Sequence, residues 1–354
     1  MNGHDYGAPD SIPERLEALS HLVGNTSLLA LRCKVDGREF TIYAKHEASN
    51  FTGSIKDRMA LHILRDAYAS GRIQPGDTIV EATSGNTGIA FAGIGRALGH
   101  PVRILMPDWM SRERVLIIQS LGAEVVPVSA AQGGFLGSIA CANKYAEEHS
   151  NVFLPLQFEN DANVEAHALT TGPEIVAQMR SAGIEPTAFV GGVGTGGTVM
   201  GVARYFRDAV PLATVHPLEP ANSPTLRTGK KVGSHRIQGI SDEFIPEIVK
   251  LKQLDEIVDV WDGDSILMAQ KLATRCGLSV GISSGANLLG AIKIAMQQGE
   301  GAAVATVFAD CNKKYLSTDY CNNEPARDDY MTPGVELLGF QVFEPANLPC
   351  QVPS

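Results

Sequence analysis

Lys56 is the residue whose type and position most directly suggest covalent chemistry. It follows a small, polar, glycine-containing segment, "ASNFTGSI" (48–55), and precedes an apolar, helix-like segment that ends near residue 64. A lysine at the start of a helix is usually solvated, and the helix N-terminus disfavours a nearby cation. The same effect, with partial burial, lowers the pKa of an amine and helps it react with an aldehyde. The segment by itself is compatible with a surface lysine and with a reactive one.

A glycine-dense segment, "GGVGTGGTVMGVARYF" (191–206), could bind a phosphate group. A strand-like segment enters it and a helix-like segment leaves it, so backbone N–H groups at the helix start can converge on one anion. No Lys-Ser/Thr pair follows, which excludes a Walker A loop, and the segment is not a clean dinucleotide-binding fingerprint. We favour a phosphate-binding loop over a tight packing turn. Its residues are Gly194, Thr195, Gly196, Gly197 and Thr198.

Two further turns before helix-like segments carry short polar side chains. "EATSGNTG" (81–88) combines such side chains with the N–H groups of a helix start, an arrangement that can hold a carboxylate. A capped helix start explains the same residues equally well. The turn's polar residues are Thr83, Ser84, Asn86 and Thr87. "GISSGANLLGAI" (281–292) contains Ser283, which alone is better explained as part of an ordinary helix start.

Together these features match the needs of one cofactor. An aldehyde that carries a phosphate requires an amine and a phosphate-binding loop, and an amino-acid substrate requires a carboxylate site. Pyridoxal 5′-phosphate is such a cofactor, and its own chemistry is to act as an electron sink. We therefore predict an enzyme in which Lys56, the segment 194–198 and the segment 81–88 meet at one site.

The elements that must position these motifs alternate along the chain from about residue 75. The predicted strands are 77–82, 101–107, 124–128, 152–157, 187–192, 213–220 and 303–309. The predicted helices include segments near 134–148, 164–181 and 198–208, and one with Ser111 as N-cap and Gly122 as stop. This alternation predicts an α/β fold of parallel sheets with helices on both faces, and a length of 354 residues favours two sheets.

Composition narrows the classes of function. The chain carries 29 basic and 39 acidic residues, a net charge of −10, which argues against a general nucleic-acid binder. No segment approaches the roughly 20 apolar residues of a membrane span, and no signal peptide is evident. The 6 cysteines are scattered without CxxC pairs, so neither a disulfide framework nor a metal site is expected. We predict a cytoplasmic protein.

At these motifs the sequence closely resembles the O-acetylserine sulfhydrylase (cysteine synthase) and cystathionine β-synthase family of fold-type II pyridoxal-phosphate enzymes. The resemblance covers about residues 20–320, with the family's motifs in order. The matching segments are "GNTSLL" (24–29), "NFTGSIKDRMA" (50–60), "EATSGNTGIAFA" (81–92), "MPDWMSRERVLIIQSLGAEVV" (106–126), "LQFENDANVEAHALTTGPEI" (156–175), "GGVGTGGT" (191–198), "QGISDEFIPEIV" (238–249), "GISSGA" (281–286) and "NKKYLSTD" (312–319). The implied fold has two open, twisted, mostly parallel sheets flanked by helices, as in tryptophan synthase β-like proteins.

The resemblance implies a role for each candidate residue. Lys56 would form the internal aldimine with the cofactor, Asn86 would hydrogen-bond the ring hydroxyl, and Ser283 would face the pyridine nitrogen. Residues 194–198 would hold the phosphate. The substrate would be bound by Thr83, Ser84, Gly85, Thr87, Gln157 and Gly239.

The implied reaction is β-replacement on an O-activated serine. The substrate amine displaces Lys56, which then acts as general base, a β-substituent leaves, and a nucleophile adds to the resulting α-aminoacrylate. A serine at the ring nitrogen cannot hold that nitrogen protonated by ion pairing, which favours elimination over transamination. The expected reaction converts O-acetylserine and sulfide to cysteine and acetate.

Other reactions remain open at this stage. One alternative is β-replacement with another donor or acceptor: cysteine, O-phosphoserine, homocysteine, cyanide, thiosulfate or an amine. Another is a β-elimination lyase that acts on cysteine or serine. A catalytically silent scaffold is disfavoured, because such a protein need not keep Lys56.

One departure from the family bears on the second substrate. Sulfhydrylases usually have glycine and alanine where this chain has Ser241, Asp242 and Glu243, which we name the acidic loop. Two carboxylates near the site entrance would repel an anionic second substrate and favour an amine or a neutral thiol. Both carboxylates could instead face solvent.

The resemblance also suggests the domain organisation. We expect an N-terminal extension (1–20), a larger cofactor-binding domain (21–56 and 158–320), a smaller domain that closes over the substrate (57–157) and a C-terminal tail (321–354). Within the tail, "VELLGFQVF" either belongs to a loose segment or forms an arm that binds a neighbouring subunit. The family implies a homodimer, and the expected partners are a small amino-acid substrate and a small nucleophile.

Overall fold

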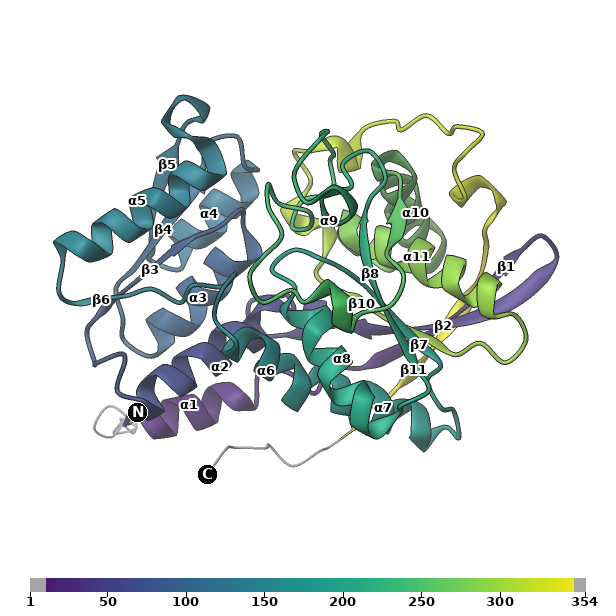
Figure 1. Ribbon diagram of the computed structural model, residues 1–354, viewed down its shortest axis with the longest axis horizontal. Coiled ribbons are helices and arrows are strands. Elements are labelled where there is room, and N and C mark those ends of the chain that lie inside the picture. Colours follow the sequence, from purple (N-terminus) through teal and green to yellow (C-terminus); the bar gives the residue numbers. More distant parts are fainter. Residues whose placement is uncertain (1–10, 347–354) are drawn as a thin grey trace, which may run out of the picture.

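Two sheets organise the chain in the computed structural model, which describes residues 11–346 (Figure 1). The larger sheet has 7 strands in the order β11-β1-β2-β10-β7-β8-β9, and the smaller has 4 strands in the order β5-β4-β3-β6. The larger sheet comprises β1 (Leu28–Val35), β2 (Arg38–His46), β7 (Ala188–Gly192), β8 (Thr214–Pro220), β9 (Val258–Val260), β10 (Val304–Phe308) and β11 (Glu336–Phe343). The smaller sheet comprises β3 (Thr78–Ala82), β4 (Val102–Pro107), β5 (Glu124–Val128) and β6 (Val152–Phe153).

The smaller sheet is built from consecutive strand–helix units. All of its strand pairs are parallel, and parallel neighbours require crossover connections, which helices provide here. These helices are α3 (Asn86–Ala97), α4 (Arg112–Ser120) and α5 (Gly134–Glu148). Ile79 of β3, Phe91 of α3 and Ile104 of β4 are each 0% exposed and share one core, so burial of apolar side chains holds this unit together.

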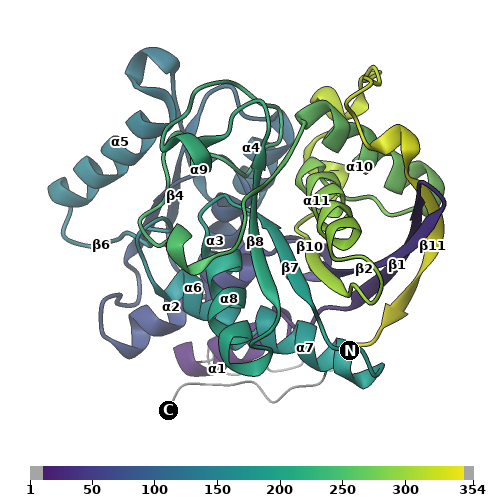
Figure 2. The same cartoon turned by 45° about the vertical axis from the view of Figure 1, so that its right-hand side comes forward.

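The larger sheet has a separate core on each face. β2, β10, β7, β8 and β9 run parallel, whereas β1 pairs antiparallel with both β2 and β11. Alternate residues of a strand face opposite sides, and accordingly Leu29 enters the core with α10 (Asp262–Cys276) and α11 (Ile282–Gln298). Leu28 enters the core with α7 (Thr171–Ser181) and α8 (Gly197–Ala209). These two helices lie on the other side of the sheet from α10 and α11 (Figure 2).

Three helices lie between the two sheets or beside them. α2 (Lys56–Ala69) contacts α3 of the smaller unit, α6 (Ala162–Leu169) and α1 (Ile12–Ser20) (Figure 1). The remaining short elements are α9 (Thr225–Thr228) and the 3₁₀ helices η1 (Glu47–Ser49), η2 (Ala130–Gln132), η3 (Leu251–Gln253), η4 (Asn312–Lys314), η5 (Asp319–Cys321) and η6 (Thr332–Gly334). No helix among residues 11–346 is long and apolar enough to cross a membrane.

The predicted fold class is confirmed, since two mostly parallel open sheets are flanked by helices. The division into domains stays a prediction, although the smaller sheet lies entirely within the predicted 57–157 segment. Residues 1–10 of the predicted extension and 347–354 of the predicted tail lie outside the described residues.

Four details differ from the sequence prediction. The helix predicted near 164–181 is two helices that break at Thr170, whose φ of −126° and ψ of −67° are not helical. The predicted strand 152–157 keeps only Val152–Phe153. Ser111 makes no side-chain cap and instead donates its hydroxyl to the Lys314 carbonyl oxygen at 2.9 Å. The 336–343 segment of the tail is not loose, because it forms β11 and pairs with β1 of its own chain.

Candidate active site

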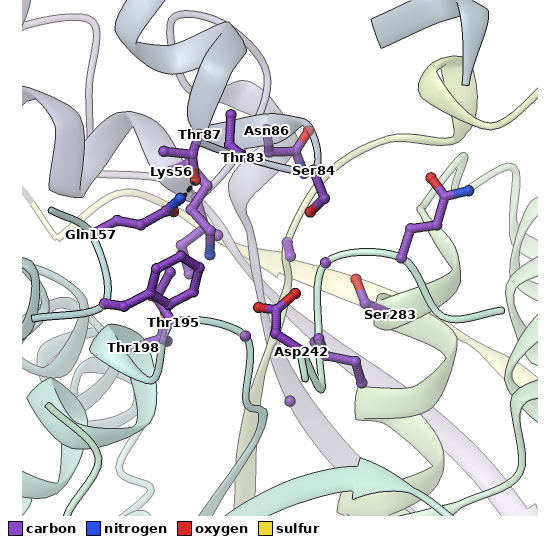
Figure 3. A pocket seen from close by; sticks show the side chains of 18 of the residues that line it. Lys56, Thr83, Ser84, Asn86, Thr87, Gln157, Thr195, Thr198, Asp242 and Ser283 are labelled. Carbon is purple, nitrogen blue, oxygen red and sulfur yellow. Dashed lines mark hydrogen bonds between the residues drawn. The ribbon is translucent and has the colours of Figure 1, made fainter. Parts of the chain in front are cut away.

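A cavity between the two sheets brings together most of the predicted site residues (Figure 3). It lies where β3 and β7 end and where α3 and α8 begin, which is the usual position of ligand sites in open α/β sheets. Its wall includes the predicted residues Lys56, Thr83, Ser84, Asn86, Thr87, Gln157, Gly194, Thr195, Thr198, Gly239, Asp242 and Ser283. Gly85, Gly196, Gly197, Ser241 and Glu243 lie in the same loops but do not line it.

Lys56 is the first residue of α2 and directs its amine into this cavity (Figure 3). Its backbone N–H donates to Ser54 Oγ at 3.3 Å, and the N–H of Ile55 donates to the Ala309 carbonyl oxygen at 2.9 Å. Burial lowers the pKa of Lys56, whereas the nearby carboxylates of Asp242 and Asp310 raise it. The amine is therefore more easily deprotonated than a surface lysine and better suited to attack a carbonyl group.

A buried ion network fixes the first turn of α2 behind Lys56. Arg58 Nε lies 2.6 Å from Glu47 Oε2, and Arg58 Nη1 lies 2.7 Å from Glu174 Oε1. Lys45 Nζ is 2.7 Å from Glu174 Oε2, so two cations balance two carboxylates. All four side chains are almost fully buried, and removing one would leave a charge without a partner. The position of Lys56 thus depends on an electrostatic cluster outside the cavity.

The segment 83–87, which is predicted to bind a carboxylate, lies at the N-terminus of α3. Thr87 Oγ1 donates to Gln157 Oε1 at 2.6 Å, and Gln157 Nε2 donates to the Ala82 carbonyl oxygen at 2.8 Å. Leu156, directly before Gln157, has a φ of +55°, a strained conformation that helps to turn Gln157 toward Thr87. Hydroxyl groups and the free N–H groups of a helix start suit a carboxylate.

The glycine-dense segment leaves no room for side chains. Gly196 has a φ of +89°, and a Cβ there would lie 2.1 Å from Val249 Cγ2. A Cβ on Gly197 would lie 1.9 Å from Asn163 Oδ1. Thr195 Oγ1 accepts from Asn163 Nδ2 at 2.9 Å, so the loop is held firmly around the start of α8. Close-packed glycines at a helix N-terminus match the needs of a phosphate group.

His167 supports the same loop as a neutral ring. Its Nε2 lies 3.2 Å from Thr198 Oγ1, and its Nδ1 lies 2.8 Å from Thr171 Oγ1. Burial, together with the nearby charges of Arg58 and Lys56, lowers the pKa of His167 to about 3. His167 therefore supplies hydrogen bonds and no charge to the loop that is predicted to bind the phosphate.

Asn86 is fixed by two charged side chains. Its Nδ2 donates to Asp310 Oδ2 at 2.8 Å, and its Oδ1 accepts from Lys314 Nζ at 2.9 Å. One N–H of Nδ2 remains for a ligand, because an amide carries two. Ser283, near the start of α11, lines the opposite side of the cavity and is a neutral donor or acceptor (Figure 3).

The three residues of the acidic loop make different contacts, although all three line a second pocket next to the cavity. Asp242 lines the cavity, and burial raises its pKa to about 6 although Lys56 opposes that rise. Ser241 has a φ of +55° and donates its hydroxyl to the Ser223 carbonyl oxygen at 3.1 Å. Glu243 pairs with Lys231 at 3.8 Å and lines a second, adjoining pocket. Of the acidic loop, only Asp242 brings a carboxylate to the cavity that contains Lys56.

The donor set fits pyridoxal 5′-phosphate. An amine with a lowered pKa, a glycine loop at a helix N-terminus and an amide with a free N–H face one cavity. Lys56, the 194–198 loop, Asn86 and Ser283 would hold the aldehyde, the phosphate and the ring. Three polar wall residues were not singled out from the sequence, namely Arg114, Gln238 and Asn287.

Comparisons with known proteins agree with this assignment. The family model of the pyridoxal-phosphate dependent enzymes matches residues 19–310. A cysteine synthase of Staphylococcus aureus is 40% identical over 303 residues, which cover 86% of this chain and 96% of the relative. A cysteine synthase structure from Entamoeba histolytica is 32% identical with a TM-score of 0.78, covering 94% of this chain and 96% of that one.

A hydrogen sulfide-producing enzyme of Fusobacterium nucleatum is also similar in structure. It is 50% identical with a TM-score of 0.91, and the match covers 94% of this chain and 99% of that chain. A mutant of the enzyme has been solved in complex with an α-aminoacrylate intermediate, and it is 51% identical with a TM-score of 0.90, covering 92% and 97%.

Proposed function

Because this chain belongs to the pyridoxal-phosphate dependent enzyme family, in its cysteine synthase-like branch, we propose that it releases hydrogen sulfide from L-cysteine and puts water in place of the sulfur. The balanced reaction is L-cysteine plus water to L-serine plus hydrogen sulfide. The observation that carries this proposal is the carboxylate of Asp242 in the cavity beside Lys56. The similar hydrogen sulfide-producing enzyme of Fusobacterium nucleatum supports it.

The predicted site residues of the cavity take different parts in this reaction. The bound cofactor supplies an electron sink that stabilises negative charge at the substrate α-carbon. The 83–87 segment and Gln157 bind the substrate carboxylate and orient the α-carbon toward Lys56, whose amine accepts the α-proton. Ser283 would face the ring nitrogen and, as a neutral side chain, would give it no ionic partner, which would favour chemistry at the β-carbon.

Asp242 selects the second substrate by its charge. With a pKa of about 6, its carboxyl group is mostly ionised at neutral pH and can accept a proton from water as the oxygen attacks the β-carbon. The same negative charge repels hydrosulfide, which disfavours its return after it leaves. A cavity with this carboxylate is thus suited to consume cysteine rather than to make it.

Synthesis of cysteine from O-acetylserine and sulfide is the second candidate. It is favoured by the 40% identity with the cysteine synthase of Staphylococcus aureus. We further propose that the 57–157 segment moves as the smaller domain and that the chain acts as a cytoplasmic homodimer.

The two candidates are separated by offering each set of substrates to the purified holoenzyme. We expect L-cysteine alone to give equal amounts of sulfide and serine, and O-acetylserine with sulfide to give cysteine far more slowly. Pyruvate and ammonia in place of serine would identify a β-elimination lyase. Rapid cysteine synthesis without sulfide release from cysteine would favour the second candidate and contradict our proposal.

A further inference from the structure

Arg114 bridges the two sheet units at the edge of the cavity. It is the third residue of α4 in the smaller unit, is 2% exposed and lines the cavity. Its Nη1 donates to Gln238 Oε1 and to Ser111 Oγ, the latter at 3.0 Å. Its guanidinium lies over the ring of Tyr315, 4.5 Å from the ring centroid. Gln238 and Tyr315 both belong to segments of the larger unit, so one side chain joins the two halves of the site.

A glycine in the carboxylate site makes the path of Arg114 possible. A Cβ on Gly85 would lie 2.3 Å from both Cδ and Nε of Arg114. Any side chain at this position would therefore displace Arg114 from Gln238. The 83–87 segment, which is to bind the substrate carboxylate, is in direct contact with the residue that reaches the other unit.

The segment 238–242 connects Gln238, the partner of Arg114, to Asp242 in the cavity. Gly239 follows it with a φ of +92°, and the N–H of Ser241 donates to the Val193 carbonyl oxygen at 2.7 Å. The segment 238–242 is therefore held at two points. Arg114 of the smaller unit binds Gln238, and Val193 of the larger unit binds Ser241. Asp242 comes directly after the second of these contacts.

We propose that Arg114 is a positioning residue that transmits closure of the smaller unit, through Gln238, to the 238–242 segment and so holds Asp242 in the cavity during the reaction. A buried guanidinium that binds neutral acceptors and an aromatic face forms strong, directional contacts. A carboxylate bound at 83–87 would stabilise the closed arrangement in which Arg114 reaches Gln238, and the coupling must be reciprocal.

A merely structural role for Arg114 makes a different prediction. The start of α4 is held independently by Glu113, whose carboxylate accepts from the N–H of Ser317 at 2.8 Å and from its hydroxyl at 2.6 Å. Loss of the contact between Arg114 and Gln238 should therefore loosen the 238–242 segment without releasing α4. Loosening of the 238–242 segment alone would indicate that Arg114 transmits closure, whereas release of α4 would indicate a merely structural role.

The test uses hydrogen exchange of the holoenzyme with and without L-alanine, which offers a carboxylate but no β-leaving group. In the wild type we expect added L-alanine to slow exchange in both 83–90 and 236–243. In Gln238→Leu and in Arg114→Lys the slowing at 83–90 should persist and that at 236–243 should be lost. Arg103→Met, which breaks an ion pair of 3.0 Å with Glu124 within the smaller unit, is the matched control and should exchange like the wild type at 236–243.

Kinetics give the second readout. This part rests on the proposed function of Asp242, and it is measured on whichever substrate the wild type converts. We expect kcat of Gln238→Leu to fall about tenfold to a hundredfold with little change in KM, since a misplacement of about 1 Å can cost as much as 10²-fold. Wild-type exchange at 236–243 in Gln238→Leu would overturn the inference. Failure to release sulfide from cysteine would overturn only the proposed function, because the exchange result does not depend on that reaction.

Discussion

Asp242→Asn removes the charge that distinguishes this cavity, and its effect on the pH profile can be worked out from the structure. Burial raises the pKa of Asp242 to about 6, while Lys56 and Lys231 lower it and Glu243 raises it further. With that pKa, about 90% of the carboxyl groups are ionised at pH 7 and about 10% at pH 5. If the ionised form accepts the proton of water, serine formation from cysteine should fall about tenfold between pH 7 and pH 5.

Asp242→Asn should form serine more slowly than the wild type, and its rate should no longer fall between pH 7 and pH 5. We expect kcat for serine formation to fall by about 10²–10⁴-fold, the usual contribution of a positioned general base. Hydrosulfide should become a better acceptor, because two unit charges about 5 Å apart repel by about 3 kcal/mol at an effective dielectric constant of about 20. Serine and sulfide are measured from pH 5 to pH 8 at saturating cysteine. A variant that keeps the wild-type rate and acid limb would refute the assignment of Asp242 as proton acceptor.

The same substitution tests the burial of Asp242 independently of activity. The pKa in the folded protein lies above the ordinary 3.8, so the contribution of this group to stability is complete below about pH 4 and is lost as the pH rises through about 6. A rise of about 2 pKa units corresponds to about 3 kcal/mol. Urea unfolding should show Asp242→Asn to be more stable than the wild type by up to about 3 kcal/mol at pH 8 and equal to it near pH 4. An equal gain at both pH values would contradict the raised pKa.

Three further predictions follow from the surroundings of the cavity. Lys56→Ala should lose the visible absorbance that the holoenzyme owes to this amine, and an unchanged spectrum would exclude Lys56 as the cofactor-binding residue. Arg58→Met should lower the free energy of unfolding by about 3–5 kcal/mol, because Glu47 then loses its ion-pair partner and Lys45 alone is left to balance two buried carboxylates, whereas Arg72→Met, in an exposed pair, should cost less than about 1 kcal/mol. Burial raises the pKa of Glu81 to about 8, so its contribution to stability is present below about pH 4.5 and lost as the pH rises through 8. Glu81→Gln should therefore raise Tm at pH 9 and leave it unchanged at pH 4, and a gain at both would contradict this assignment.

The parts of the fold that were predicted from the sequence are those with a strong local signal. β4 and β7 are short apolar segments between turn residues, and their predicted bounds are correct to within one residue. The break at Thr170 was missed because the apolar pattern continues through it, and only the packing of α6 and α7 against α8 favours two helices. β1 and β2 precede the regular alternation and were not assigned, since an antiparallel hairpin has no crossover helix to mark it.

In the site, too, only residues with a strong local signal were predicted from the sequence. A segment with several adjacent signals, such as the glycines and threonines of 194–198, points to a ligand from the sequence alone. Arg114 and Gln238 carry no such signal, because they are 124 positions apart and acquire a role only when the two units meet. Asp242 was noticed as a departure from the family, but only the structure separates it from Glu243, which lies in the adjoining pocket.

The buried ion network behind Lys56 has a consequence for the order in which the protein is assembled during synthesis. Lys56 leaves the ribosome early. The ion pair between nearby Arg58 and Glu174 can form only later, because Glu174 is 116 positions further along the chain. The hydrogen bond between Asn86 and Asp310, which are 224 positions apart, forms later still. Contacts of such sequence separation form late and slowly. An aldehyde cofactor would therefore meet a nascent chain whose amine is still an ordinary solvated lysine, and selective capture at Lys56 would begin only when nearly the whole chain has been made.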